Sequence, residues 1–220
     1  MLAFVFGTGM IHRMYKIGKS LKPAHGVPPG IFIASLFCCA AFSADAWVLT
    51  ITPGARTVYL GVGNSTTNAA NATINLVSVT VAANAVGTGA AQAMTSNSTQ
   101  ANSPYDAFTV CVPPNQVYIG GYFREPSTTV NVAALQVNTP ATLTTGVDTL
   151  PFTQISWTST ALGNAVADIP AGTFNGATLF LRNIASNRFV ENCHTFSYAN
   201  TSVVAAGIYN GRATYTLTSP

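Results

Sequence analysis

Within the stretch ENCHTFSYAN, residues 191–200, the side chains of residues 193–198 alternate with the period of a β-strand. Within it, His194, Phe196 and Tyr198 fall on one face, and Cys193 and its alternate neighbours fall on the other. An alternating run that carries a cysteine and three aromatic rings predicts a strand inside a packed sheet rather than a helix or a loop.

The N-terminal part of the chain differs from the rest in charge and hydropathy. Four basic residues precede an apolar run, residues 31–42 (IFIASLFCCAAF), and the small-residue stretch SADA, residues 43–46, follows it. A basic region, a short apolar region and an A-x-A site are typical of a secretory signal peptide. The apolar run is also shorter than the roughly 20 residues that span a bilayer.

We therefore predict a signal peptide, residues 1–46, with Met10 or Met14 as an alternative start. Contact with a membrane is then expected only during export. The predicted location is secreted, periplasmic or at the surface of a bacterial cell. A single domain, residues 47–220, follows the leader.

The predicted mature part of the chain, residues 47–220, is electrically balanced. It contains five arginines, no lysine and five acidic residues, so the formal charge of +3 belongs to the leader. A nucleic-acid-binding surface needs a basic patch that neutralises phosphates. The balance therefore excludes nucleic acid as a partner.

Two cysteines remain after the leader, Cys111 and Cys193, and in an exported chain they most simply form one disulfide. The sequence around Cys111 also alternates, as a strand does. A cysteine–histidine active site is the alternative, but in a strand His194 points away from its neighbour Cys193. Glu191-x-x-His194 by itself is too little for a metal site. We predict no catalytic residue, no metal site and no cofactor.

Short alternating or β-branched segments recur between turn signals through the mature part. The predicted strands are Trp47–Thr52, Thr57–Val62, Thr73–Ala82, Tyr105–Val112, Val117–Phe123, Thr129–Val137, Phe152–Thr158, Ala177–Ile184, Cys193–Tyr198 and Arg212–Thr218. Asn210-Gly211 is a candidate tight turn.

About ten short strands in one domain predict an all-β fold, an Ig-like or pilin-like antiparallel β-sandwich with one disulfide. Two small, polar, nearly uncharged stretches, residues 63–72 and 83–104, are predicted as long loops.

Residues 206–218 (AGIYNGRATYTLT) resemble the closing strand of exported bacterial pilin-like subunits, a group that includes spore coat protein U-like proteins and chaperone–usher fimbrial subunits. The resemblance covers this strand only. It implies an incomplete Ig-like sandwich whose missing strand comes from a chaperone and then from a neighbouring subunit. Two features depart from the family: the chain ends without the usual penultimate tyrosine, and its cysteine pair joins the middle of the chain to the C-terminal region.

Directly after the predicted cleavage site, Trp47, Leu49 and Ile51 alternate, which is the pattern of an N-terminal donor segment that adds a strand to another subunit. An ordinary first strand of the domain has the same pattern. The expected partners are copies of this chain or related subunits.

The composition favours a non-catalytic structural or adhesive surface protein, and a fimbrial or filament subunit is one form of it. The alternative is a secreted carbohydrate-binding sandwich that recognises surface glycans through the aromatic residues Tyr118, Tyr122 and Phe123, for which core packing is the competing explanation. An exported hydrolase would have to use His194 and scattered acids, without any motif of mechanistic spacing. We therefore predict no enzymatic activity.

Overall fold

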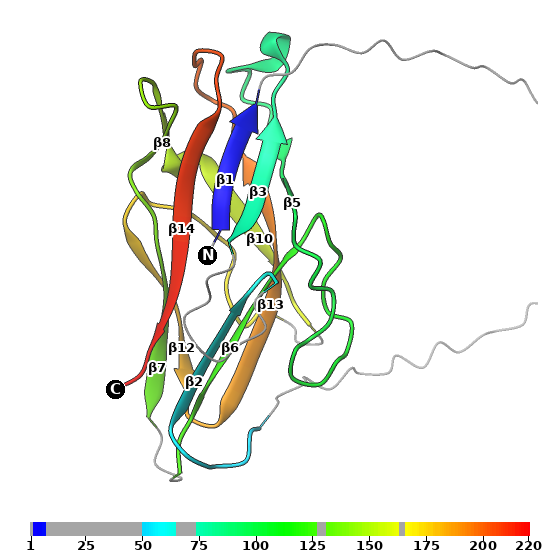
Figure 1. Cartoon of the computed structure of the whole chain (residues 1–220), viewed down its shortest axis with the longest axis vertical. Coiled ribbons are helices and arrows are strands. Elements are labelled where there is room, and N and C mark those ends of the chain that lie inside the picture. The colour runs from blue at the N-terminus through cyan, green and yellow to red at the C-terminus, as the bar shows by residue number, and fades with distance from the viewer. Residues whose placement is uncertain (1, 8–49, 65–73, 127–130, 163–165) are drawn as a thin grey trace, which may run out of the picture.

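The computed structural model describes residues 2–7, 50–64, 74–126, 131–162 and 166–220, and their regular structure is almost entirely β (Figure 1). The strands are β1 (Leu2–Gly7), β2 (Thr57–Val62), β3 (Asn75–Thr80), β4 (Gln92–Ala93), β5 (Thr95–Ser96), β6 (Val117–Arg124), β7 (Val132–Asn138), β8 (Thr142–Thr144), β9 (Thr149–Pro151), β10 (Ile155–Thr160), β11 (Gly172–Thr173), β12 (Thr178–Ala185), β13 (Arg188–Tyr198) and β14 (Tyr209–Thr218). Two short 3₁₀ turns, η1 (Ala83–Ala85) and η2 (Phe152–Gln154), complete the set.

The strands form two sheets. Sheet one has the order β12-β7-β14-β1-β3-β5, with β8 beside β14 and β9 beside β8. Sheet two has the order β11-β10-β13-β6-β2, with β4 beside β13. Among the described strands, every pair is antiparallel except β1 with β3. One apolar core takes its side chains from both sheets. The predicted all-β sandwich is confirmed.

Alternation along β14 explains how the last strand joins this core. Tyr209, Ala213 and Tyr215 are buried, whereas Arg212 between them is exposed. Gly211 also faces inward, where an added Cβ would lie 2.7 Å from a ring carbon of Phe152. The predicted tight turn at Asn210-Gly211 is therefore wrong: this glycine provides close packing inside a strand.

The strand that opened the sequence analysis, β13, lies between β10 and β6 and has the predicted faces. Phe196, His194 and Tyr198 are buried. Trp157 of β10 stacks on the His194 ring, with centroids 5.8 Å apart, and packs against Phe174 at 4.8 Å. Each such apolar side chain contributes about 1.5–3 kcal/mol of stability through burial.

Several predicted segments differ from the structure. Tyr105–Val112 is not a strand, because its backbone forms turns and a single isolated bridge, Asn102 with Thr109. Residues 83–104, predicted as one loop, hold η1, β4 and β5. Of Trp47–Thr52, only Thr50 makes a bridge, and residues 47–49 lie outside the described residues. Most of the other predicted loop, residues 63–72, lies outside them too.

Cys111 and Cys193 form the predicted disulfide, with their Cα atoms 5.5 Å apart. Both are buried against Tyr118, on the outer face of sheet two. The bond ties the segment between β5 and β6, residues 97–116, to β13. The disulfide therefore fixes the position of this segment against sheet two.

Candidate functional site

The first candidate site is the place of β1 in sheet one. Residues 2–7 lie between the last strand, β14, and β3, as the blue strand beside the red one in Figure 1 shows. Leu2 is paired with Ala213 and Phe6 with Tyr209 in the antiparallel ladder to β14. The same six residues run parallel to β3. The N-terminal end of the chain thus completes the middle of a sheet built otherwise from residues beyond 74.

Without β1, sheet one would have a gap one strand wide. Residues 209–213 of β14 pair with five of the six residues of β1, and residues 75–80 of β3 pair with all six on the other side. Backbone amide and carbonyl groups must be paired when they are shielded from water, and each orphaned group costs about 1–3 kcal/mol. We call this gap, bounded by β14 and β3, the strand slot.

The predicted donor segment has only one of its three apolar residues in the described part. Ile51 is buried among the side chains of its own domain, in a cluster with Tyr59 and Phe189. Its amide donates to the carbonyl of Asn187 at 2.9 Å. In this structure Ile51 therefore packs within its own domain, as expected of an ordinary first segment, and the donor role of residues 47–51 stays a prediction. Trp47 and Leu49 lie outside the described residues.

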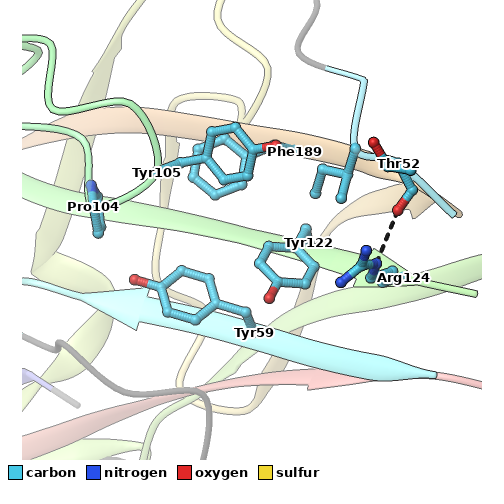
Figure 2. A pocket seen from close by; sticks show the side chains of 8 residues that line it. Thr52, Tyr59, Pro104, Tyr105, Tyr122, Arg124 and Phe189 are labelled. Atoms are coloured by element: carbon cyan, nitrogen blue, oxygen red, sulfur yellow. Dashed lines mark hydrogen bonds between the residues drawn. The ribbon is translucent and has the colours of Figure 1, made fainter. Parts of the chain in front are cut away.

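The second candidate site is an aromatic pocket on the outer face of sheet two. Tyr59 of β2 is paired with Tyr122 of β6, and Tyr122 is paired with Phe189 of β13. The three rings therefore form a row across three neighbouring strands, with centroids 5.4 Å apart for the first pair and 6.3 Å for the second. The pocket above them has a volume of about 340 Å³ (Figure 2).

A wall of the aromatic pocket comes from the segment that the disulfide holds. Pro104 and Tyr105 lie at the turn of this segment, and the Tyr105 ring stacks on Phe189 with centroids 5.1 Å apart (Figure 2). Ala101 accepts hydrogen bonds from the amides of Val110 and Cys111, both at 2.9 Å, which closes the turn. The floor of the pocket is therefore sheet two, and its wall is a segment that the Cys111–Cys193 disulfide links to that sheet.

Arg124 supplies the positive charge of the pocket. Its Nε donates to the carbonyl of Thr52 at 2.8 Å, the bond drawn in Figure 2. Its guanidinium lies over Gly54, where an added Cβ would be 2.7 Å from Cζ. Among the described residues it has no acidic partner, whereas Arg56 pairs with Glu125 at 2.6 Å and Arg182 with Asp168 at 3.1 Å.

Two glycines next to the aromatic row make room for tyrosine side chains. Gly61 and Gly120 are cross-strand partners, and the hydroxyl of Tyr59 lies 2.8 Å from the Cβ position of Gly61. The Tyr118 hydroxyl lies against the Cβ position of Gly120. It donates a hydrogen bond to the carboxylate of Glu191 at 2.9 Å. Burial raises the pKa of Glu191, and burial beside Glu191 raises the pKa of Tyr118.

Two of the three predicted ligand-facing aromatics are interior residues. Tyr118 and Phe123 are both 0% exposed, so neither is available to a ligand on the surface. Tyr122 does line the aromatic pocket. Its partners Tyr59 and Phe189 were not among the predicted site residues, because only the register of three strands brings them together. The sequence offered one sign of this row: Tyr59 lies in a predicted strand, residues 57–62, whose side chains point to alternate faces.

His194 has no route to a substrate. It is fully buried, and neither ring nitrogen has a hydrogen-bond partner among the described residues. Burial lowers its pKa to about 3, so the ring is neutral at physiological pH. Its contacts are the Trp157 stack and the edge of Phe196. The histidine is an aromatic member of the core.

A metal-binding cluster of three or more histidine, cysteine or acidic residues is not found in the described part of the chain. In the same residues, no helix has the length and apolar character needed to cross a membrane. The fold and its bond define the class: an all-β sandwich with one disulfide. No protein-family model, curated protein or solved structure matches the chain.

Proposed function

We propose that the chain is an exported structural subunit of a surface assembly, and that a strand from a related subunit fills the strand slot in the mature protein. The observation that carries the proposal is the position of β1. Residues 2–7 complete sheet one, yet they precede the predicted cleavage site at residue 46. Cleavage there removes the strand that β14 and β3 need.

The chemistry of the slot favours an extended peptide as the occupant. An inserted strand gains main-chain hydrogen bonds on both sides, and this is how β-strand addition provides affinity without a deep pocket. Both edges of the slot belong to core strands, since Tyr209 and Val77 are 1% exposed. The resemblance of residues 206–218 to the closing strand of pilin-like subunits supports the same conclusion.

The donor is a different subunit rather than residues 47–52 of a second copy. Cleavage after residue 46 leaves three residues before Thr50, which bridges to Arg188 of its own domain. Ile51 is fixed in the same place by its amide and its side chain. A six-residue slot cannot be filled by three residues unless that part of the donor domain is pulled apart. The partner therefore contributes its own apolar extension.

The test uses residues 47–220 with and without a tethered strand. β1 runs antiparallel to β14 and starts beside Ala213, so a strand attached after Pro220 must first return past residues 214–220, about 24 Å. A Gly/Ser linker of about 18 residues has a matching average length. We expect residues 47–220 followed by this linker and the sequence LAFVFG to be monomeric and to melt at least about 10 °C higher than residues 47–220 alone.

A matched control carries proline at the positions of Phe4 and Val5 in the tethered strand, which removes two backbone donors. Its melting temperature should equal that of residues 47–220 without a tethered strand. If residues 47–220 alone are monomeric and as stable as the tethered form, sheet one has no missing strand and the proposal is wrong.

A further inference from the structure

We propose that the aromatic pocket binds an acidic pyranose, a uronic-acid unit of a polysaccharide. The site lies on the outer face of sheet two, whereas the strand slot lies in sheet one. It therefore adds a ligand-binding activity to the structural role and does not depend on that role. Its occupant follows from three properties of the lining: apolar ring surface, free hydroxyl groups and an unpaired guanidinium.

The ring surface suits the face of a sugar. One face of a pyranose is a set of C–H groups, which gains by leaving water and packing on an aromatic surface. Tyr105 is 43% exposed and Tyr122 is half-buried, so these two rings present area to solvent. Tyr59 and Phe189, each 6% exposed, hold them from behind. A volume of about 340 Å³ lies within the range of small-ligand pockets.

The polar groups of the lining favour a ligand with many hydroxyls over a purely apolar one. The hydroxyls of Tyr105 and Tyr122 make no hydrogen bond to another described residue, and each can donate and accept. The Tyr59 hydroxyl is buried beside Gly61, so it is not counted among the groups that meet a ligand. An apolar ligand would shield the Tyr105 and Tyr122 hydroxyls from water without pairing them, which costs affinity.

Arg124 adds the preference for an acid. Its Nε is already used by Thr52, and that bond holds the planar group in place over Gly54. The two terminal nitrogens remain as donors, and among the described residues no carboxylate neutralises them. A guanidinium that presents two N–H donors binds a carboxylate with both of its oxygens. The ring and its carboxylate then occupy adjacent parts of one pocket.

The test is calorimetric titration of the full chain with trisaccharides of galacturonate, mannuronate and glucuronate. Each is compared with the neutral hexose trisaccharide of the same configuration and linkage. We expect at least one uronate to bind at least about tenfold more tightly than its neutral counterpart, because one charge-assisted pair is gained. If no uronate exceeds its neutral counterpart, the proposal is wrong.

Variants separate the charge from the ring surface. Arg124→Gln should lower the affinity for the uronate about tenfold and leave the weak neutral binding unchanged. Tyr105→Ala should weaken both ligands, because it removes the stapled wall. Arg212→Gln is the control, since that arginine is exposed on β14 and lies outside the pocket. Equal losses in Arg124→Gln and Arg212→Gln, in proteins with unchanged melting temperatures, would overturn the assignment to this pocket.

Discussion

The buried ring of His194 should make the stability of the domain fall in mild acid. The pKa of the ring is lowered by burial to about 3 in the folded protein, against 6.5 for a free histidine. Between these values the unfolded chain binds a proton that the folded protein does not. The free energy of unfolding therefore keeps its full value above about pH 6.5 and decreases as the pH falls toward 3.

The size of the loss follows from the same two pKa values. At pH 5, 1.5 pH units below the unfolded pKa, His194 should reduce the free energy of unfolding by about 2 kcal/mol relative to pH 8. Glu191 acts in the opposite direction, because burial raises the pKa of its carboxyl and the folded state then gains a proton first. Only a comparison with a variant isolates the histidine.

His194→Phe is the informative substitution. A phenyl ring keeps the stack on Trp157 and removes two buried nitrogens that have no partner among the described residues. Urea unfolding at pH 8 and pH 5 should show that the variant loses about 2 kcal/mol less than the original protein over this interval. It should also be at least as stable at pH 8, because no buried polar atom is left unpaired there. Equal pH dependence in the two proteins would show that the buried His194 ring does not lower stability in acid.

Three further substitutions test other parts of the fold. Cys193→Ser removes a disulfide between residues 82 apart in the sequence. The chain-entropy relation predicts a free energy of unfolding lower by about 4.5 kcal/mol, which urea unfolding measures. Gly120→Ala places a methyl group against the Tyr118 hydroxyl and displaces the hydrogen bond of that hydroxyl to Glu191. Urea unfolding should show a free energy of unfolding lower by about 1–3 kcal/mol. Tyr215→Pro places a proline inside the ladder of β14 with β7 and should abolish the folded circular-dichroism spectrum.

The local patterns of the sequence predict much of this fold. Alternation in residues 193–198 and 212–218 predicted strands β13 and β14, which are central in their sheets. The two cysteines that follow the predicted leader predicted the disulfide. Both predictions need only the sequence: the two-residue alternation of side chains along a strand, and the number of cysteines. Tyr105–Val112 misled the same reasoning, because its alternation serves a loop pinned by Cys111 rather than a sheet.

The candidate sites could not be predicted in this way, since each depends on contacts between distant segments. The strand slot requires residues 2–7 to lie beside residues 209–213. The aromatic pocket requires the register of three strands together with the turn at Tyr105. A one-residue change of register would turn Tyr122 to the core, and no single strand's pattern encodes that choice.

We propose that the mature sandwich is completed by a strand from another chain. Native mass spectrometry of the protein exported by its own host tests it most directly, because one spectrum gives both the mass of this chain and the mass of whatever remains bound. The expected result is a chain that begins at Trp47 and is held in a complex with a second, different chain. A free monomer, whether it begins at Trp47 or retains residues 2–7, would contradict it.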